Sequence, residues 1–132
     1  MYFNDFDMLK SLLIVGAGSF AGGALRYLVS QLMKGACGTS FPWATLAINL
    51  AGCLLMGVVY GLFSRNVSTS HALCLLLTTG FCGGFTTFSA FANEGLAMLQ
   101  DGNLWAFAVY VLASVLAGVA MVALGYWIVK VF

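Results

Sequence analysis

Hydrophobic residues occur along this chain in four long, nearly continuous runs, which cover residues 9–32, 43–63, 71–100 and 104–132. A helix needs about 20 mostly apolar residues to cross a bilayer, and each run is long enough. Transmembrane β-strands would instead alternate apolar and polar positions over about ten residues. The pattern therefore predicts an all-α membrane protein, a single domain of four transmembrane helices.

The polar connections between the runs are short, at residues 33–42, 64–70 and 101–103. Short connections favour antiparallel neighbours, so both termini should lie on the same side of the membrane. The four runs occupy nearly all of the 132 residues, which leaves no room for a separate catalytic domain.

Composition agrees with a lipid environment. The chain is 62% hydrophobic and only 7% charged, whereas soluble domains are about 25% charged. The formal net charge of +1 gives no sign of a nucleic-acid partner. The sequence has a single histidine and no Ser/His/Asp or Cys/His arrangement, so we expect no enzyme and no catalytic residues.

The distribution of basic residues bears on orientation. The side with the termini should collect Lys10, Arg65 and Lys130, and the other side Arg26 and Lys34. An excess of Lys and Arg in cytoplasmic loops normally sets orientation. A difference of one permits insertion in both directions, and so an antiparallel dimer of identical chains. Four close-packed helices also fill their own centre, so a conducting protein favours a homodimer.

Glycine and threonine interrupt the third run near its middle, where residues 78–89 contain three glycines and four threonines. Such a cluster predicts a helix that is broken in mid-span, because unwound backbone is tolerated in a membrane where it is buried in protein or lines a cavity. Broken helices present carbonyl groups that can hold ions. The alternative is an intact helix whose glycines serve packing.

Four phenylalanines mark the same region, at steps of 4, 3 and 3, which in a continuous helix places them roughly on one side: Phe81, Phe85, Phe88 and Phe91. The edge of an aromatic ring is electropositive and could favour an anion without a fixed charge. The alternative interpretation is an ordinary apolar stripe.

Polar residues repeat at helical spacing in two other runs. Thr45 and Asn49 share a face of the second, and Tyr110 and Ser114 share a face of the fourth. In lipid such side chains normally face protein or water. Interhelical hydrogen bonding is the simpler explanation for Ser114, whereas the Asn49 amide is costly to leave partly satisfied in hydrocarbon.

Small residues also recur four apart, and in lipid this spacing lets helix backbones approach closely. We expect most of these pairs to serve packing within one subunit; they are Gly18/Gly22, Gly57/Gly61, Gly80/Gly84 and Ser114/Gly118.

Two ionisable residues, Arg26 and Glu94, lie within runs, each about 9 Å from the end of its run at 1.5 Å per residue. Arg26 could extend to the interface or concentrate anions near a vestibule. A central carboxylate would suggest proton-coupled transport, but the position of Glu94 is peripheral.

Three stretches together resemble the small Fluc-type (CrcB-type) fluoride channels: residues 16–27, 42–52 and 78–91, which occur in the family's order. The resemblance implies a dual-topology antiparallel homodimer with two fluoride pores in a bacterial cell (inner) membrane. It also implies a central structural sodium ion held by backbone carbonyls at the break, at the positions of Gly83 and Thr86. Ala90 departs from the family, in which a Ser or Thr is usual at that position, and Gly118 stands where some relatives carry a hydroxyl.

The fluoride pathway that the resemblance implies consists of Asn49, Phe88, Phe91, Thr45, Tyr110, Ser114, Arg26 and Glu94. We therefore expect a passive, fluoride-selective channel that exports fluoride. One rival is a small proton-coupled multidrug-type exporter, for which Glu94 is the only candidate carboxylate within a run. The other rival is an accessory membrane subunit that passes no ion.

Overall fold

The computed structural model describes residues 5–36, 38, 40–65 and 70–132, and all the regular structure in these ranges is helical. The elements in chain order are α1 (Asp5–Ala36), α2 (Trp43–Arg65), α3 (His71–Leu75), the π-helix η1 (Leu76–Cys82), α4 (Gly83–Phe85), α5 (Phe88–Gln100) and α6 (Leu104–Val131).

Four of the described segments are long and apolar enough to cross a membrane, which confirms the predicted four spans: Phe6–Ala36, Trp43–Arg65, His71–Gln100 and Leu104–Val131. The bounds differ most in α1, which starts earlier than predicted and continues through Ala36. The first connection is consequently shorter than residues 33–42. Helix α2 likewise continues to Arg65, two residues past the predicted end.

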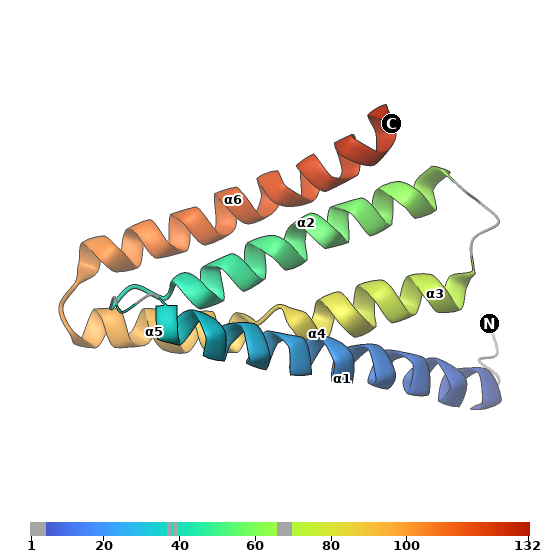
Figure 1. Ribbon diagram of the computed structural model, residues 1–132, viewed down its shortest axis with the longest axis horizontal. Coiled ribbons are helices and arrows are strands. Elements are labelled where there is room, and N and C mark those ends of the chain that lie inside the picture. The colour runs from blue at the N-terminus through green and yellow to red at the C-terminus, as the bar shows by residue number, and fades with distance from the viewer. Residues whose placement is uncertain (1–4, 37, 39, 66–69) are drawn as a thin grey trace.

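Successive spans run in opposite directions, and the start of α1 lies at the same end of the molecule as the end of α6, as predicted (Figure 1). The most extensive packing, however, joins helices that run in the same direction. Helix α1 packs along η1 and α4, and α2 packs along α6. The bundle is therefore two parallel pairs, and α5 extends from the first pair to contact α6.

Glycines allow the first pair to approach backbone to backbone. A side chain at Gly22 would overlap the carbonyl oxygen of Phe81, and one at Gly84 would meet the backbone of Ser19 at 2.5 Å. Gly18 and Gly80 lie against each other at the same interface. These G-x-x-x-G pairs therefore serve packing within one chain, as predicted.

The second pair uses the same device. A side chain at Gly57 would overlap the carbonyl of Val122, and one at Gly125 would overlap that of Leu54. Gly125 belongs to none of the spaced pairs in the sequence. Its role was missed because the contact depends on the register of α6 against α2, which a single helix does not reveal.

The third span is broken, as predicted, at Thr86 and Thr87. Both residues have extended backbone, with ψ of 157° at Thr86 and 116° at Thr87. The Thr87 hydroxyl then caps α5 by accepting a hydrogen bond from the backbone N–H of Ala90 at 3.2 Å. A hydroxyl cap of this kind satisfies one of the N–H groups that a helix start leaves without a partner.

Candidate functional site

An open groove of about 320 Å³ lies beside the break and brings together residues from α2, α5 and α6. Its lining is mostly apolar, with a few polar side chains that converge from separate helices. The lining residues are Asn49, Gly52, Cys53, Met56, Thr86, Thr87, Phe88, Phe91, Ser114, Val115 and Val122. A mostly apolar cavity with few, placed polar groups is the usual form of a small-ligand site.

Asn49 ties α2 to the break through two hydrogen bonds. Its amide Nδ2 donates to the Thr87 carbonyl at 3.1 Å, and the Thr87 backbone N–H donates to Oδ1 at 2.8 Å. The side chain thus replaces helical partners that the break removes. Among the described residues, no acceptor takes the second N–H of this amide, and the side chain lines the groove.

Ser114 lines the same groove, and its Oγ is buried without a hydrogen-bond partner among the described residues. The expectation of an interhelical hydrogen bond at Ser114 was wrong. An unsatisfied buried hydroxyl costs about 1–3 kcal/mol, so such groups usually have a reason to persist. Within the described part of the chain, this hydroxyl is therefore an unused donor on a residue that lines the groove.

The phenylalanines form two separate pairs, so the expected single stripe was wrong. Phe81 and Phe85 stack before the break, with ring centroids 5.9 Å apart. Phe88 and Phe91 follow it, 5.7 Å apart and tilted by 44°, and both line the groove. The two extended residues between the pairs reset the direction in which later side chains point. Phe91 also packs on Tyr110 at 5.0 Å.

Glu94 joins three helices. Thr45 Oγ1 on α2 and the hydroxyl of Tyr110 on α6 each donate to one oxygen of its carboxylate, both at 2.7 Å. Tyr110 is fully buried, and Thr45 is nearly so. Sequence spacing placed Glu94 near a span end but gave no sign that it would be the shared acceptor of two predicted pathway hydroxyls.

A second, more polar cavity of about 330 Å³ adjoins this cluster at the connection between α1 and α2. Thr45 and Glu94 line it, together with Ser30, Lys34 and Ser40. Because Tyr110 contacts Phe91, which lines the groove, polar and aromatic groups connect the two cavities. The sequence pattern did not predict Ser30, Lys34 or Ser40 as lining residues, because they converge only in the fold.

Arg26 does not extend away from the protein. It is half-buried, and its Nε donates to the carbonyl oxygen of Gly84 at 3.2 Å. Gly84 lies in the last turn before the break, where carbonyl groups lose their usual partners. The guanidinium therefore satisfies one such carbonyl and brings a positive charge toward the break.

Two further carbonyl groups at the break lack their helical donors. In a continuous α-helix the Thr87 N–H would donate to Gly83, but it donates to Asn49. The Ala90 N–H would donate to Thr86, but it donates to the Thr87 hydroxyl. No backbone hydrogen bond within the described residues reaches either oxygen. Free backbone oxygens suit a hard cation such as sodium, so these residues fit the predicted site.

Residues 13–126 match the family described as CrcB-like protein, Camphor Resistance (CrcB). The chain belongs to the CrcB family. Among curated relatives, a protein of Phocaeicola vulgatus is 44% identical over 90% of this chain and 98% of its own length. A protein of Chlorobium phaeobacteroides is 43% identical over 96% of this chain and 98% of its own length. Both relatives are named fluoride-specific ion channel FluC.

Membership of the CrcB family and four spans together establish a multi-pass integral membrane protein. A third relative, from Leptospira interrogans, is 41% identical over 93% of this chain and carries the same name. The resemblance drawn from residues 16–27, 42–52 and 78–91 is thereby confirmed at the level of the family.

Proposed function

We propose that this protein is a passive, fluoride-selective channel in a bacterial cell (inner) membrane. The observation that carries the proposal is a set of uncharged donors for which the described residues offer no acceptor: the buried Ser114 hydroxyl and the second N–H of Asn49 both belong to residues that line one groove. Two relatives are named fluoride-specific ion channels, which supports fluoride as the conducted ion. Among the residues that the structure describes, no Lys or Arg lines this groove, so an anion there would meet donors rather than fixed positive charge.

Uncharged donors suit conduction of a strongly hydrated anion. Moving a bare ion out of water costs tens of kcal/mol in a continuum estimate if no other groups replace its hydration shell. Amide and hydroxyl N–H and O–H groups can replace that water, and the electropositive ring edges of Phe88 and Phe91 can add to them. Several weak sites release an ion more readily than one strong site, as a channel requires.

The pathway that the geometry supports runs between the two cavities. Fluoride would enter the polar cavity beside Lys34, pass the Thr45–Glu94–Tyr110 cluster and reach Asn49 and the groove. At the cluster an anion competes with the Glu94 carboxylate for the same two hydroxyls. Arg26 adds positive potential near the break through its place on Gly84.

A second, inverted copy of the chain would complete the site. Phe88 borders the groove yet is 79% exposed, so one wall of the pathway is missing from a single chain. Near-equal numbers of basic residues on the two sides permit inversion. Two inverted copies would enclose two grooves and so form two pores.

A structural sodium ion fits the break of such a dimer. The carbonyl oxygens of Gly83 and Thr86 would hold it, because neither has a backbone donor among the described residues. When bound, sodium would add fixed positive charge to a region of otherwise uncharged donors. Arg26, by occupying the neighbouring Gly84 carbonyl, keeps that oxygen out of the ligand set.

Fluoride efflux from liposomes tests the proposal against both rivals. With a potassium ionophore to balance charge and no proton gradient, reconstituted protein should release fluoride, whereas protein-free liposomes should not. A proton-coupled exporter would need its carboxylate, so Glu94→Gln should abolish its transport but leave a passive channel largely open. Protein that passes no ion at all would identify an accessory subunit and overturn the proposal.

A further inference from the structure

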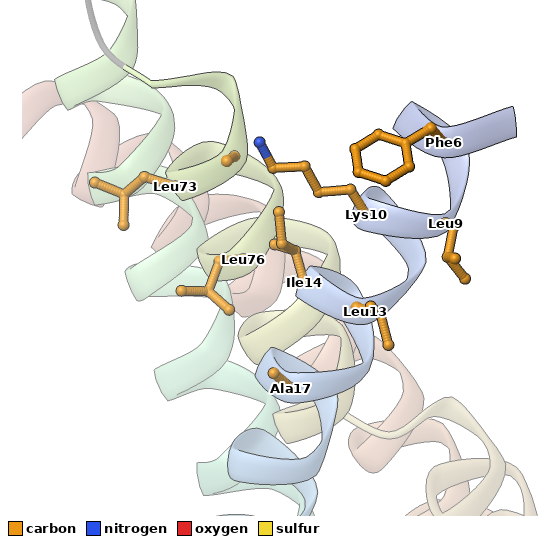
Figure 2. Close-up of a pocket in the computed structure, with 9 residues that line it drawn as sticks. Phe6, Leu9, Lys10, Leu13, Ile14, Ala17, Leu73 and Leu76 are labelled. Carbon is orange, nitrogen blue, oxygen red and sulfur yellow. The ribbon is translucent and has the colours of Figure 1, made fainter. Parts of the chain in front are cut away.

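A second groove, unrelated to the pathway, lies between the first half of α1 and the start of the third span (Figure 2). Its volume is about 580 Å³, larger than that of the groove beside the break. Eight of its nine lining residues are apolar, and the ninth is a lysine: Phe6, Leu9, Lys10, Leu13, Ile14, Ala17, Ala72, Leu73 and Leu76.

The groove exists because the two helices are in close contact only farther along. Gly18 and Gly22 bring α1 against η1 and the start of the break region, where an added side chain would overlap the backbone of Leu76 and Phe81. Toward its N-terminus, α1 carries bulky residues, and Leu9 and Leu13 remain 55% and 67% exposed. The apolar walls consequently stay open to the surrounding membrane.

Of the nine described residues that line the groove, only Lys10 is charged. Figure 2 shows its side chain reaching across from α1, with the amine toward the α3 side and above Ile14 and Leu76. Lysine stems lie along apolar surface in membranes while the ammonium stays among the headgroups. Lys10 lies in the second turn of α1, close to the end of the span, where phospholipid phosphates are within reach.

We propose that this groove binds one anionic phospholipid, with an acyl chain between α1 and η1 and the headgroup phosphate at Lys10. A headgroup with a net negative charge neutralises the ammonium, whereas the choline of a zwitterionic headgroup would oppose it, and an acyl chain matches the eight apolar residues. The lining of this groove shares no residue with that of the groove beside the break.

A second copy of the chain fits this groove less well. It would have to bury the Lys10 ammonium against an apolar surface, and an unpaired buried charge is costly. The groove also ends at Leu76, ten residues before Thr86, or about 15 Å along a helix. The proposed dimer contact at the break is thus well separated from it.

Lipid titrations of the purified protein test the headgroup contact. Phosphatidylglycerol and phosphatidylcholine with identical acyl chains are added in detergent, and bound lipid is counted by native mass spectrometry. The wild-type protein should prefer phosphatidylglycerol by about fivefold, the effect of one basic residue at a membrane surface. Lys10→Gln should reduce this ratio to about one. Lys34→Gln, at the other end of α1, is the matched control and should keep it.

Filling the groove tests the acyl-chain contact. Ala17 lines the inner end of the groove, so Ala17→Phe should reduce retention of both lipids, whereas Ala21→Phe on the same helix should not, because Ala21 lies outside the lining. An unchanged lipid preference in Lys10→Gln would overturn the proposal, as would unchanged retention in Ala17→Phe. Dissociation of the oligomer by Ala17→Phe would assign the groove to a second copy instead. None of these readouts depends on fluoride transport.

Discussion

The two halves of the third span pack in opposite ways. Before the break, η1 and α4 lie against α1 with glycine facing backbone, as Gly22 does at Phe81 and Gly84 at Ser19. After the break, α5 has few such contacts, and side-chain hydrogen bonds and aromatic rings hold it instead. Close packing of glycines against backbone holds the half before the break, and side-chain hydrogen bonds and aromatic contacts hold the half after it.

The half before the break therefore contributes mainly to stability, and the half after it contributes mainly to ion passage. Close backbone contact before the break leaves little freedom, which holds the carbonyl groups of the last turn in place. Polar contacts after the break leave donors such as the Asn49 N–H available to an anion. Changes in the first half should therefore reduce stability, and changes around the second should reduce flux.

The largest effect should follow from Gly22→Val. The new side chain would overlap the Phe81 carbonyl, so we expect a loss of about 3 kcal/mol in the free energy of unfolding. Gly16→Val on the same helix has open space and should change little beyond helix propensity. Unfolding in a graded detergent series measures both. Equal losses in the two variants would contradict the packing described for α1 and η1.

Asn49→Ala should affect both stability and flux. It removes two hydrogen bonds and leaves the Thr87 N–H without a partner, which should cost about 2 kcal/mol. Fluoride efflux should fall at least about tenfold, which corresponds to about 1.4 kcal/mol. Asn49→Asp keeps an acceptor for the Thr87 N–H but has no donor for an anion. Wild-type flux in Asn49→Asp would show that the Asn49 amide does not donate to the anion.

Phe88→Ile and Phe91→Ile should reduce flux by up to about tenfold, because ring contacts contribute about 0.5–1.5 kcal/mol. Assembly should fall less than flux in both variants, because isoleucine keeps an apolar side chain where a second copy would cover the 79% exposed Phe88. Phe20→Ile is the matched control, since Phe20 is 80% exposed on α1 and lines neither cavity of the pathway. Flux and oligomer mass are measured on the same preparations, so that a loss of flux can be separated from a loss of assembly. Normal flux in both variants would contradict a contact between the ring edges and the anion.

Ser114→Ala should give the smallest change. Its hydroxyl has no partner among the described residues, so its loss should leave stability unchanged or slightly higher. Fluoride flux should fall about threefold, because one uncharged donor contributes about 0.5–1.5 kcal/mol. Ser64→Ala, which removes a hydroxyl that donates to the Gly61 carbonyl, should leave flux unchanged. A clear loss of stability in Ser114→Ala would mean that the hydroxyl has a structural partner.

The sequence predicted those features of the fold that depend on the residues of a single segment. Apolar run length predicted the four spans, and the Gly/Thr cluster predicted the break now seen at Thr86 and Thr87. Spacing within a helix also predicted that Gly18 and Gly22 pack against a neighbour. Each of these inferences needs only the geometry of a single helix.

Features that depend on several helices were not predictable. The role of Glu94 as shared acceptor requires α2, α5 and α6 to meet. The prediction that four phenylalanines share one helix face was wrong because it assumed a continuous helix. Two extended residues, Thr86 and Thr87, lie between the second and third rings, and composition does not give their dihedral angles. Arg26 was assigned to an interface or vestibule because its acceptor, the Gly84 carbonyl, exists only where the break frees it.

The selectivity of efflux from liposomes tests the central claim most directly: that uncharged donors beside the break replace the hydration shell of fluoride. Fluoride and chloride release from the wild-type protein are compared at equal gradients with a potassium ionophore. Fluoride should leave rapidly, while chloride release should equal that of protein-free liposomes. Equal release of the two halides through the protein would show a non-selective pore and contradict the claim.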